Sequence, residues 1–433
     1  MKPLDLAGVG IGPFNLSLAA LAEPVGDLDI ALFDRRAEFR WHPGLLLEGA
    51  TIQVPFLADL VTLVDPTNPL SFLNYLREKG RLFPFYFAER FHIPRVEYDD
   101  YGRWAASRLD GCRFSSEVTE LRWLAEQAAF EIALSGAQPV LARNVVLGVG
   151  SSPSVPLPLA HLVSDPEVLA THSADYLTQR DRLLAAETVT VVGSGQSGAE
   201  VFLDLLRGRA SAVGLRWLAR TPAFAPMEYS KLGLEQFTPD YTAYFRRLPE
   251  PVRDRLLPAQ WQLYKGIDAE TIAAIHDELY RLSVGDSWPA VVMTPGVEVL
   301  AARKNGDTLE LDVRHVQQET TATLRTHAVV AATGYAETPT NGLLGPLGDK
   351  LERDGSGRLA VDADYRLRLP PEITGSIFVQ NAERHTHGAG APDLGLGAWR
   401  SASIINAVAG RDVYALPDRT AFTTFGLHSS EAL

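Results

Sequence analysis

The sequence is poor in cysteine: Cys112 is the only cysteine among its 433 residues. A single thiol excludes an internal disulfide framework and is typical of proteins that work in a reducing compartment. No stretch of apolar residues is long enough to span a membrane, and no basic segment followed by an apolar run precedes the first expected strand. We therefore expect a cytoplasmic protein without a membrane span.

The sequence also has fewer basic than acidic residues: 40 lysine and arginine residues against 53 aspartate and glutamate residues. With a net charge of −13, the chain is not expected to bind nucleic acid, since surfaces that do so are basic. Apolar residues, by contrast, make up 46% of the chain. Together with its length, this composition is sufficient for two or three domains with sizeable cores.

A glycine-rich turn stands between a strand pattern and a helix pattern near the middle of the chain. Residues 189–192 are apolar or β-branched and are expected to form a buried parallel strand, and the residues after the turn have helical spacing. Gly193, Gly195 and Gly198 complete the pattern G-x-G-x-x-G. The first glycine permits a tight turn, the second lets a pyrophosphate approach the backbone, and the third lets the helix pack closely. This context predicts a dinucleotide site.

A second glycine-rich turn follows the strand expected at residues 4–7. Gly8 and Gly10 match the first two glycines of the pattern, while Pro13 stands at the third position with Gly12 just before it. This copy therefore departs from the full pattern. Two such units in one chain predict that the protein holds two dinucleotides and passes a hydride between them.

The residue that ends the strand after each turn indicates which dinucleotide binds there. Asp34 ends the strand of the first unit, and an acid at this point accepts a hydrogen bond from a ribose 2′-hydroxyl, as with FAD or NAD. Arg220 ends the corresponding strand of the second unit, where a guanidinium suits a 2′-phosphate. The second unit is therefore expected to prefer NADPH over NADH.

Strand patterns are missing between residues 222 and 287, where prolines, aromatic residues and helical spacing dominate, and they return at residues 291–331. The predicted fold class is α/β, with two Rossmann-like dinucleotide-binding domains and a mainly helical substrate-binding insertion. His385 and His387 form a His-x-His pair near the end of the chain. No cysteine or further ligand stands at a supporting spacing, so we do not expect a metal site.

Several short segments, taken in order, resemble one family over roughly residues 5–410. They are Gly-x-Gly-x-Gly-Pro-Phe-Asn-Leu-Ser, Phe-x-Trp-His, Gln-x-x-Phe-x-x-Asp-Leu-Val-Thr, Ser-Phe-Leu-Asn-Tyr-Leu, Val-Gly-Ser-Gly-Gln-Ser-Gly-Ala-Glu, Ala-Thr-Gly-Tyr and His-Thr-His-Gly. Each is weak alone, but the ordered set resembles the flavin-dependent N-hydroxylating monooxygenases of siderophore biosynthesis.

The resemblance implies a reaction. NADPH reduces FAD, O2 adds to the flavin C4a, and the hydroperoxide gives its distal oxygen to a neutral primary amine while NADP⁺ stays bound. It also implies a homo-oligomer, a tetramer in this family. The expected domains are FAD-binding at 1–160 and 336–433, NADPH-binding at 161–221 and 288–335, and substrate-binding at 222–287.

The resemblance also assigns roles to individual residues. Trp41, His42 and Gln53 are expected to lie against the flavin ring, with His42 and Gln53 as catalytic residues. Gln196 and Ser197 are expected to contact NADP⁺. Tyr335, at the end of the Ala-Thr-Gly-Tyr segment, is a further cofactor-binding candidate.

Two departures from the family concern the substrate. Hydroxylases of ornithine or lysine generally carry lysine where this chain has Ala58, and ornithine hydroxylases carry asparagine where it has Leu234. In the family these two polar residues hold the α-carboxylate of the amino acid. Their loss favours a substrate without a carboxylate, such as cadaverine or putrescine. Lys231 offers a substitute anchor, so L-lysine or L-ornithine remains an alternative.

A diamine needs an acceptor for its second, charged amine. Glu228 and Glu235 in the helical insertion are candidates, and Gly395 is a further candidate position beside the substrate. Rival classes are an NADPH-dependent flavin reductase, a Baeyer–Villiger-type oxygenase and a non-catalytic flavoprotein. A reductase of this kind usually has a redox cysteine pair, which one cysteine does not provide.

Overall fold

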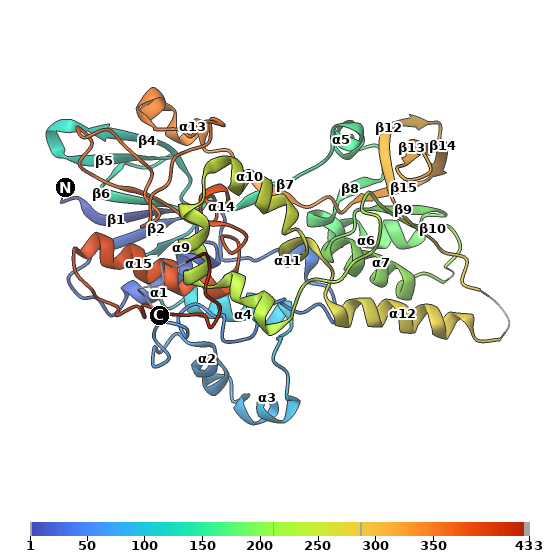
Figure 1. The fold of residues 1–433 in the computed structure, drawn as a ribbon, viewed down its shortest axis with the longest axis horizontal. Coiled ribbons are helices and arrows are strands. Elements are labelled where there is room, and N and C mark those ends of the chain that lie inside the picture. The colour runs from blue at the N-terminus through green and yellow to red at the C-terminus, as the bar shows by residue number, and fades with distance from the viewer. Residues whose placement is uncertain (1, 211, 286–287, 428–433) are drawn as a thin grey trace.

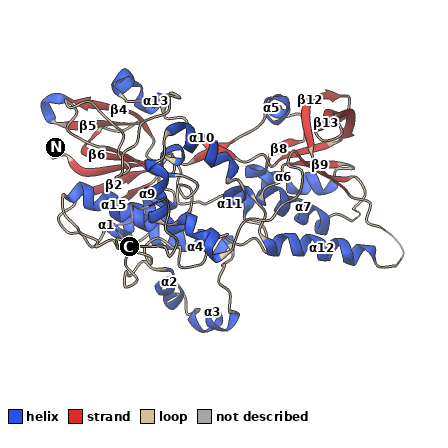
Figure 2. Cartoon of the chain, in the orientation of Figure 1, coloured by secondary structure: helices blue, strands red, loops and turns tan. Residues whose placement is uncertain are grey.

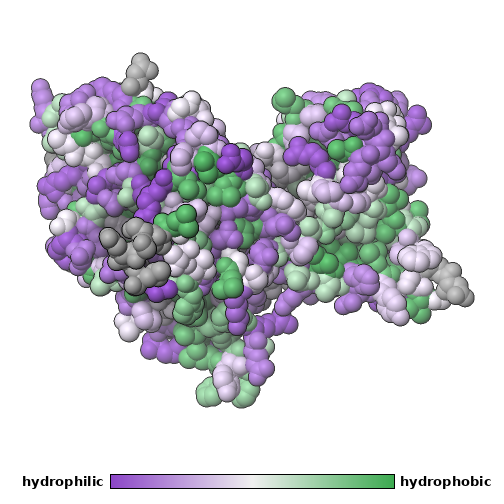
Figure 3. All heavy atoms as spheres, in the orientation of Figure 1, coloured by the Kyte–Doolittle hydropathy of each residue, from purple (hydrophilic) through white to green (hydrophobic). Residues whose placement is uncertain are grey.

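The computed structural model describes residues 2–210, 212–285 and 288–427. Two sheets covered by helices lie side by side along the long axis of the molecule, and the first and last described residues lie on the side of the first sheet (Figures 1 and 2). A notch separates the two halves at the top of the view, and both hydrophilic and hydrophobic residues cover this face (Figure 3).

The first sheet has the strand order β3-β2-β1-β6-β5-β4, and β17 also pairs with β6. β1, β2, β3, β6 and β17 are joined in parallel, whereas β4 and β5 form an antiparallel edge. The central strands are apolar and buried because helices cover parallel sheets on both faces. The strands are β1 (Leu4–Val9), β2 (Ile30–Phe33), β3 (Cys112–Arg113), β4 (Val118–Leu124), β5 (Ala129–Leu134), β6 (Val140–Leu147) and β17 (Ile377–Val379).

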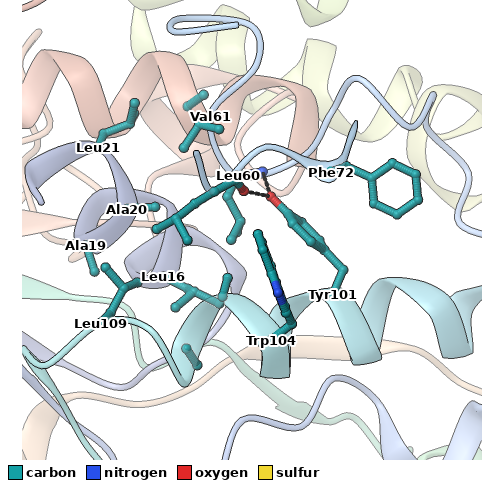
Figure 4. Packing of buried hydrophobic residues seen from close by; sticks show 14 of the residues in the cluster. Leu16, Ala19, Ala20, Leu21, Leu60, Val61, Phe72, Tyr101, Trp104 and Leu109 are labelled. Atoms are coloured by element: carbon teal, nitrogen blue, oxygen red, sulfur yellow. Dashed lines mark hydrogen bonds between the residues drawn. The ribbon is translucent and has the colours of Figure 1, made fainter. Parts of the chain in front are cut away.

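Helices α1 (Pro13–Ala22) and α15 (Gly397–Ala409) pack against each other beside this sheet. Next to them lies an aromatic cluster from α2 (Phe72–Glu78) and α4 (Arg95–Ala106), shown in Figure 4. Tyr101 of α4 accepts a hydrogen bond from the Leu60 N–H (3.2 Å) and donates one to the Leu70 carbonyl (2.7 Å). These bonds fix the connection between β2 and α2, which the sequence shows only as a buried segment. A short helix, α3 (Leu82–Ala88), projects beyond α2.

The second sheet is entirely parallel, with the strand order β11-β10-β9-β15-β8. A three-stranded antiparallel sheet, β12-β13-β14, packs beside it. The strands and helices of this half of the molecule are β8 (Ala170–His172), β9 (Val189–Val192), β10 (Leu215–Ala219), β11 (Val292–Pro295), β12 (Val297–Asn305), β13 (Thr308–His315), β14 (Thr320–Thr326), β15 (Ala328–Ala331), α5 (Leu157–Val163), α6 (Tyr176–Ala185) and α7 (Gln196–Gly208).

The chain crosses between the two sheets twice, and the two crossings pair with each other. β7 (Ser151–Pro153) leads from the first sheet to the second, and β16 (Tyr335–Glu337) leads back. Together they form an antiparallel two-stranded ribbon between the halves of the molecule (Figure 1). This ribbon brings the first residue of β16, Tyr335, to the boundary between the two nucleotide units.

The segment predicted to be helical contains five α-helices, one short 3-10 helix (Glu235–Phe237) and no strand in its described residues, 222–285. It contacts both halves of the molecule: α9 and α10 pack against α14 (Arg384–His387), and α12 packs against α7. The five helices are α8 (Lys231–Leu234), α9 (Pro239–Arg247), α10 (Glu250–Ala259), α11 (Gln262–Lys265) and α12 (Ala269–Ser283); α13 (Asn341–Leu344) lies outside the segment, near the first sheet.

Candidate functional site

The two glycine turns have nearly the same backbone geometry at the helix that follows each. Gly12 is the N-cap residue just before α1, with φ −91° and ψ −177°, and Gly195 is the N-cap residue just before α7, with φ −88° and ψ −178°. A Cβ atom placed on Gly12 meets nothing within 4 Å, and one placed on Gly195 meets only the Lys265 carbonyl at 3.6 Å. Both helix N-termini therefore face open space, where backbone N–H groups and the helix dipole attract a pyrophosphate.

The glycine two residues earlier in each turn, Gly10 or Gly193, serves the fold instead. The expected register of the first turn is therefore wrong by two residues: Gly10 and Gly12, not Gly8 and Gly10, correspond to Gly193 and Gly195, and Asn15, not Pro13, stands at the third position. Gly10 (φ +86°) and Gly193 (φ +129°) adopt backbone conformations that favour glycine. A Cβ atom would lie 2.5 Å from the Gly148 carbonyl oxygen in one case and 2.0 Å from the Ala332 carbonyl oxygen in the other. Gly8 is also crowded, with the Leu32 side chain 2.7 Å from its Cβ position. Pro13 fits as the first residue of α1, where a missing N–H costs no helical hydrogen bond.

Asp34 lies buried at the end of β2 and connects that strand to the glycine turn. Its carboxylate accepts hydrogen bonds from the Ile11 N–H (2.7 Å) and from Arg36 Nη2 (2.7 Å). Although burial opposes it, hydrogen bonds from Arg36 and Ile11 hold the pKa of Asp34 below its usual value. The carboxylate is therefore ionised and fixed beside the first turn. Its contact with a ribose stays a prediction.

Arg220 lies exposed at the end of β10. Lys265 and Arg384 add positive charge nearby, and both lie 5.5 Å from the centre of the Tyr264 ring. Burial, then Arg384 and Arg220, lower the pKa of Lys265. The sequence did not indicate that Lys265 and Arg384 lie near Arg220, because they belong to α11 and to the segment after β17, far from Arg220 along the chain. The positive charges of Arg220, Lys265 and Arg384 together are suited to binding phosphate groups.

Replacing Arg220 by alanine is expected to raise the KM for NADPH about tenfold while changing the KM for NADH much less, since an exposed charge-assisted contact to the 2′-phosphate is lost. Steady-state kinetics with both nucleotides measure the ratio. Arg207→Ala, on the exposed end of α7, is the control and leaves both constants unchanged. Equal losses with NADPH and NADH would show that Arg220 does not recognise the 2′-phosphate.

On the first-sheet side, Trp41, His42 and Tyr335 form a continuous row of rings. The ring centres are 5.1 Å apart for Trp41 and His42 and 5.4 Å apart for His42 and Tyr335. Tyr335 also contacts His172, at 5.4 Å. Burial, with help from the positive charge of Arg95, lowers the pKa of His42 to about 4, so its ring is neutral at physiological pH.

Two buried polar atoms in this region have no hydrogen-bond partner among the described residues: Gln53 Nε2 and the Tyr335 hydroxyl oxygen. Such atoms are rare in folded proteins unless a ligand or water satisfies them. Together with the open helix N-termini at Gly12 and Gly195, they show that the residues present fit two dinucleotides. Gln196 differs, because its amide already bonds to Glu200, Thr271 and the Asp268 N–H. Ser197 follows it in the first turn of α7.

A second group of residues adjoins Gln53. The Tyr229 hydroxyl donates a hydrogen bond to the Gln53 carbonyl (3.1 Å). Ala58 is buried beside Gly395, whose Cβ position lies 3.9 Å from the Ala58 Cβ and 2.8 Å from Asp393 Oδ1. Burial raises the pKa of Asp393 to about 6, although the Gly395 N–H and Arg400 favour the carboxylate. Asp393 and Tyr229 were not among the sequence-based candidates.

The glutamates predicted to hold the substrate already bind backbone groups. Glu228 is exposed and accepts a hydrogen bond from the Ser230 N–H. Glu235 accepts hydrogen bonds from the N–H groups of Phe422 (3.0 Å) and Thr423 (2.8 Å) in the C-terminal segment. Leu234 lies on α8 with 38% of its surface exposed. The role of these residues in binding an amine stays a prediction.

The His-x-His pair has structural partners. His385 Nε2 lies 2.9 Å from the Leu359 carbonyl oxygen, and the His387 ring stacks on Tyr365 at 4.6 Å. In the described part of the chain, no three histidine, cysteine, aspartate or glutamate side chains are grouped to hold a metal ion. None of the described helices combines the length and apolar character needed to cross a membrane.

Two dinucleotide turns on separate sheets, with a half-buried row of rings at the crossing between them, define a two-dinucleotide flavoprotein oxidoreductase. The chain belongs to the L-lysine 6-monooxygenase/L-ornithine 5-monooxygenase family, whose family model matches residues 2–337. This confirms the family expected from the ordered sequence segments. The protein is a flavin-dependent N-monooxygenase that uses NADPH and O2, and solved members of the family contain FAD and NADP⁺.

Three similar proteins cover nearly the whole chain. The rhizobactin siderophore biosynthesis protein RhbE of Rhizobium meliloti is 43% identical, over 100% of this chain and 97% of that protein. A putrescine N-hydroxylase of Shewanella oneidensis is 40% identical, over 97% of this chain and 84% of that protein. The FAD-bound structure of DfoA, a cadaverine monooxygenase of the desferrioxamine pathway in Erwinia amylovora, has a TM-score of 0.93 and 37% identity, and the match covers 99% of this chain and 100% of that one. The predicted fold class is confirmed by this likeness.

Proposed function

We propose that this protein N-hydroxylates one amine of an aliphatic diamine, putrescine or cadaverine, in the cytoplasm as a step of hydroxamate siderophore synthesis. The observation that carries the proposal is the wall formed by Ala58, Gly395 and Asp393. The Ala58 methyl group stands where amino-acid hydroxylases of this family carry lysine, and the Asp393 carboxylate lies on the other side of Gly395. The similarity to a putrescine N-hydroxylase and a cadaverine monooxygenase supports the same substrate class.

Charge decides between a diamine and an amino acid at this wall. A diamine that has lost one proton carries a neutral amine for oxidation and an ammonium that Asp393 can bind. L-Lysine or L-ornithine adds an α-carboxylate, which the Asp393 carboxylate repels. Lys231, the alternative anchor for that carboxylate, lies on the exposed face of α8. The favoured substrate is therefore a diamine.

We assign the glycine turns to the two cofactors. Residues 1–160 and 336–433 bind FAD, with Gly8, Gly10, Gly12, Pro13 and Asp34 at the dinucleotide and Trp41, His42 and Gln53 near the ring. Residues 161–221 and 288–335 bind NADPH. Bound FAD, reduced by NADPH, supplies the chemistry that activates O2 and transfers one oxygen atom.

The chain's own residues prepare the amine for this chemistry. An ammonium has no lone pair, so the amine near the flavin must be neutral although its pKa in water is about 10.4. Burial beside the uncharged His42 ring disfavours the protonated form. Tyr229 fixes the Gln53 main chain, and the unpartnered Gln53 amide remains able to donate a hydrogen bond.

The test compares four amines at equal concentration: cadaverine, putrescine, L-lysine and L-ornithine. We expect kcat/KM for hydroxylamine formation to be at least about tenfold higher for the better diamine than for either amino acid. The reason is that burying an unpaired carboxylate weakens substrate binding by about 1–3 kcal/mol or more. A match between either amino acid and the better diamine would reject the diamine proposal. We further propose a homo-oligomer, a tetramer by family resemblance, which sedimentation velocity can test.

A further inference from the structure

A buried ion pair joins the two nucleotide units. Arg95 begins α4, beside the first sheet, and Glu200 lies on α7, directly after the second glycine turn. Arg95 Nη2 lies 2.6 Å from Glu200 Oε1, and Arg95 Nη1 lies 2.9 Å from Oε2. The side chains are only 7% and 5% exposed. The pair thus has two charge-assisted hydrogen bonds in a fixed geometry.

The arginine also holds both loops that carry the predicted flavin contacts. Arg95 Nη1 donates to the Leu45 carbonyl (2.9 Å), and the Leu45 N–H in turn donates to the His42 carbonyl (2.9 Å). Arg95 Nη2 donates to the Thr51 carbonyl (3.5 Å), two residues before Gln53. The position of this guanidinium therefore determines where the two loops lie.

The glutamate holds the predicted NADP⁺ contact on the other side. Glu200 Oε1 accepts a hydrogen bond from Gln196 Nε2 (3.0 Å). Gln196 Oε1 accepts one from the Asp268 N–H (2.8 Å) at the start of α12. One chain of hydrogen bonds thus runs from the loops of the first unit, through Arg95 and Glu200, to the helix N-terminus of the second.

Stability alone does not explain such a pair. Desolvating two charges offsets most of their attraction, and well-packed apolar residues of similar size stabilise a protein as well or better. What the pair adds is a single relative placement of the groups bonded to it. A side chain that binds the carbonyls of one unit and the helix of another restricts motion between them.

We propose that Arg95 and Glu200 are positioning residues that hold the second glycine turn in register with the flavin-side loops. The proposal rests on the FAD and NADPH assignments and is independent of which amine is oxidised. In the coupled reaction NADPH, H⁺, O2 and RNH2 give NADP⁺, H2O and RNHOH. When NADP⁺ is held poorly, NADPH, H⁺ and O2 give NADP⁺ and H2O2 instead, and the amine is unchanged.

The test replaces both charges together, so that neither is left buried and unpaired. We expect Arg95→Met/Glu200→Met to fold and retain FAD. Its Kd for NADP⁺, measured by calorimetry on the oxidised holoenzyme, should rise about fivefold or more. Hydroxylamine formed per NADPH should fall while H2O2 per NADPH rises by the complementary amount. The calorimetric measurement needs no amine, so failure of the diamine proposal would leave it unaffected.

A matched control exists on the same helix. Arg180 of α6 makes two hydrogen bonds to Asp204 of α7 (2.7 and 3.0 Å), but both helices flank the second sheet. Arg180→Met/Asp204→Met should leave the NADP⁺ Kd and the product ratio at wild-type values. If the first double variant loses FAD or does not fold, Glu200→Gln decides: its amide fits the same space but has one oxygen to accept from Arg95 where the carboxylate has two, so the NADP⁺ Kd should still rise. Wild-type NADP⁺ affinity and coupling in the variant that folds would overturn the proposal.

Discussion

A Gly195→Val enzyme is expected to fold, to keep FAD and to lose affinity for NADPH about a hundredfold. The structure leaves room for the new side chain, since the nearest atom to the Cβ position is the Lys265 carbonyl oxygen at 3.6 Å. The backbone at φ −88° also accepts any residue. The valine methyl groups instead occupy the space in front of α7, where the pyrophosphate must approach. Steric displacement of this kind costs about 3 kcal/mol, which corresponds to about a hundredfold in Kd.

The measurements are the NADP⁺ Kd, the flavin content and the melting temperature. Gly12→Val is the mirror variant: its Cβ position is equally open, so it should lose FAD rather than NADP⁺. Gly193→Val tests the opposite case, because its Cβ would lie 2.0 Å from the Ala332 carbonyl oxygen at φ +129°, and it should not fold stably. Wild-type NADPH affinity in folded Gly195→Val would contradict the assignment of NADPH to the second turn.

The nucleotide units were predictable from the sequence because their signals are local. A buried strand, a turn that only glycine can make and a helix follow one another within a dozen residues, and each depends on short-range sterics. The different roles expected for Gly193 and Gly195 agree with the structure, but the register of the first unit was misjudged because Gly8, Gly10 and Gly12 offer two overlapping matches to the pattern. Gly10 and Gly193 are required by backbone crowding, whereas Gly12 and Gly195 leave space for a ligand.

The ion pair and the substrate wall were not predictable, because they depend on contacts between distant segments. Arg95 and Glu200 are 105 residues apart, and nothing in either local sequence indicates the other. From the sequence, Glu235 is a reasonable candidate to bind the substrate ammonium. In the fold, its carboxylate accepts hydrogen bonds from two N–H groups of the C-terminal segment. Asp393 stands in a loop without a regular pattern, and only the fold brings it beside Gly395 and Ala58.

Asp393→Asn is expected to lower kcat/KM for the diamine about thirtyfold. The change removes the charge that would bind the distal ammonium, and a hydrogen bond to a charged group contributes about 2 kcal/mol. The asparagine oxygen can still accept the Gly395 N–H, which Asp393 Oδ1 binds at 2.7 Å, so the local turn should persist. Asp268 is a second carboxylate whose charge acts on Tyr229, and it caps α12. Asp268→Asn should have little effect on kcat/KM. If Asp268→Asn lowers kcat/KM and Asp393→Asn does not, Asp268 binds the ammonium.

The pH dependence gives an independent test of the same residue. Burial raises the pKa of Asp393 to about 6, so the carboxylate becomes neutral below that pH and stops attracting the ammonium. The reacting amine must also lose a proton, since its pKa is about 10.4. A plot of log kcat/KM against pH should therefore rise with a slope of about two below pH 6, and of about one above it.

A monoamine separates the two ionisations. Pentylamine has a reacting amine but no distal ammonium, so its kcat/KM should be low, should rise with a slope of about one on both sides of pH 6, and should not change in Asp393→Asn. His42 does not interfere, because its pKa is lowered to about 4. The diamine profile of Asp393→Asn should match the monoamine profile in slope, since only one proton then remains to be lost. If the wild-type diamine profile keeps a single slope through pH 6, Asp393 does not bind the ammonium, and the second amine is held elsewhere.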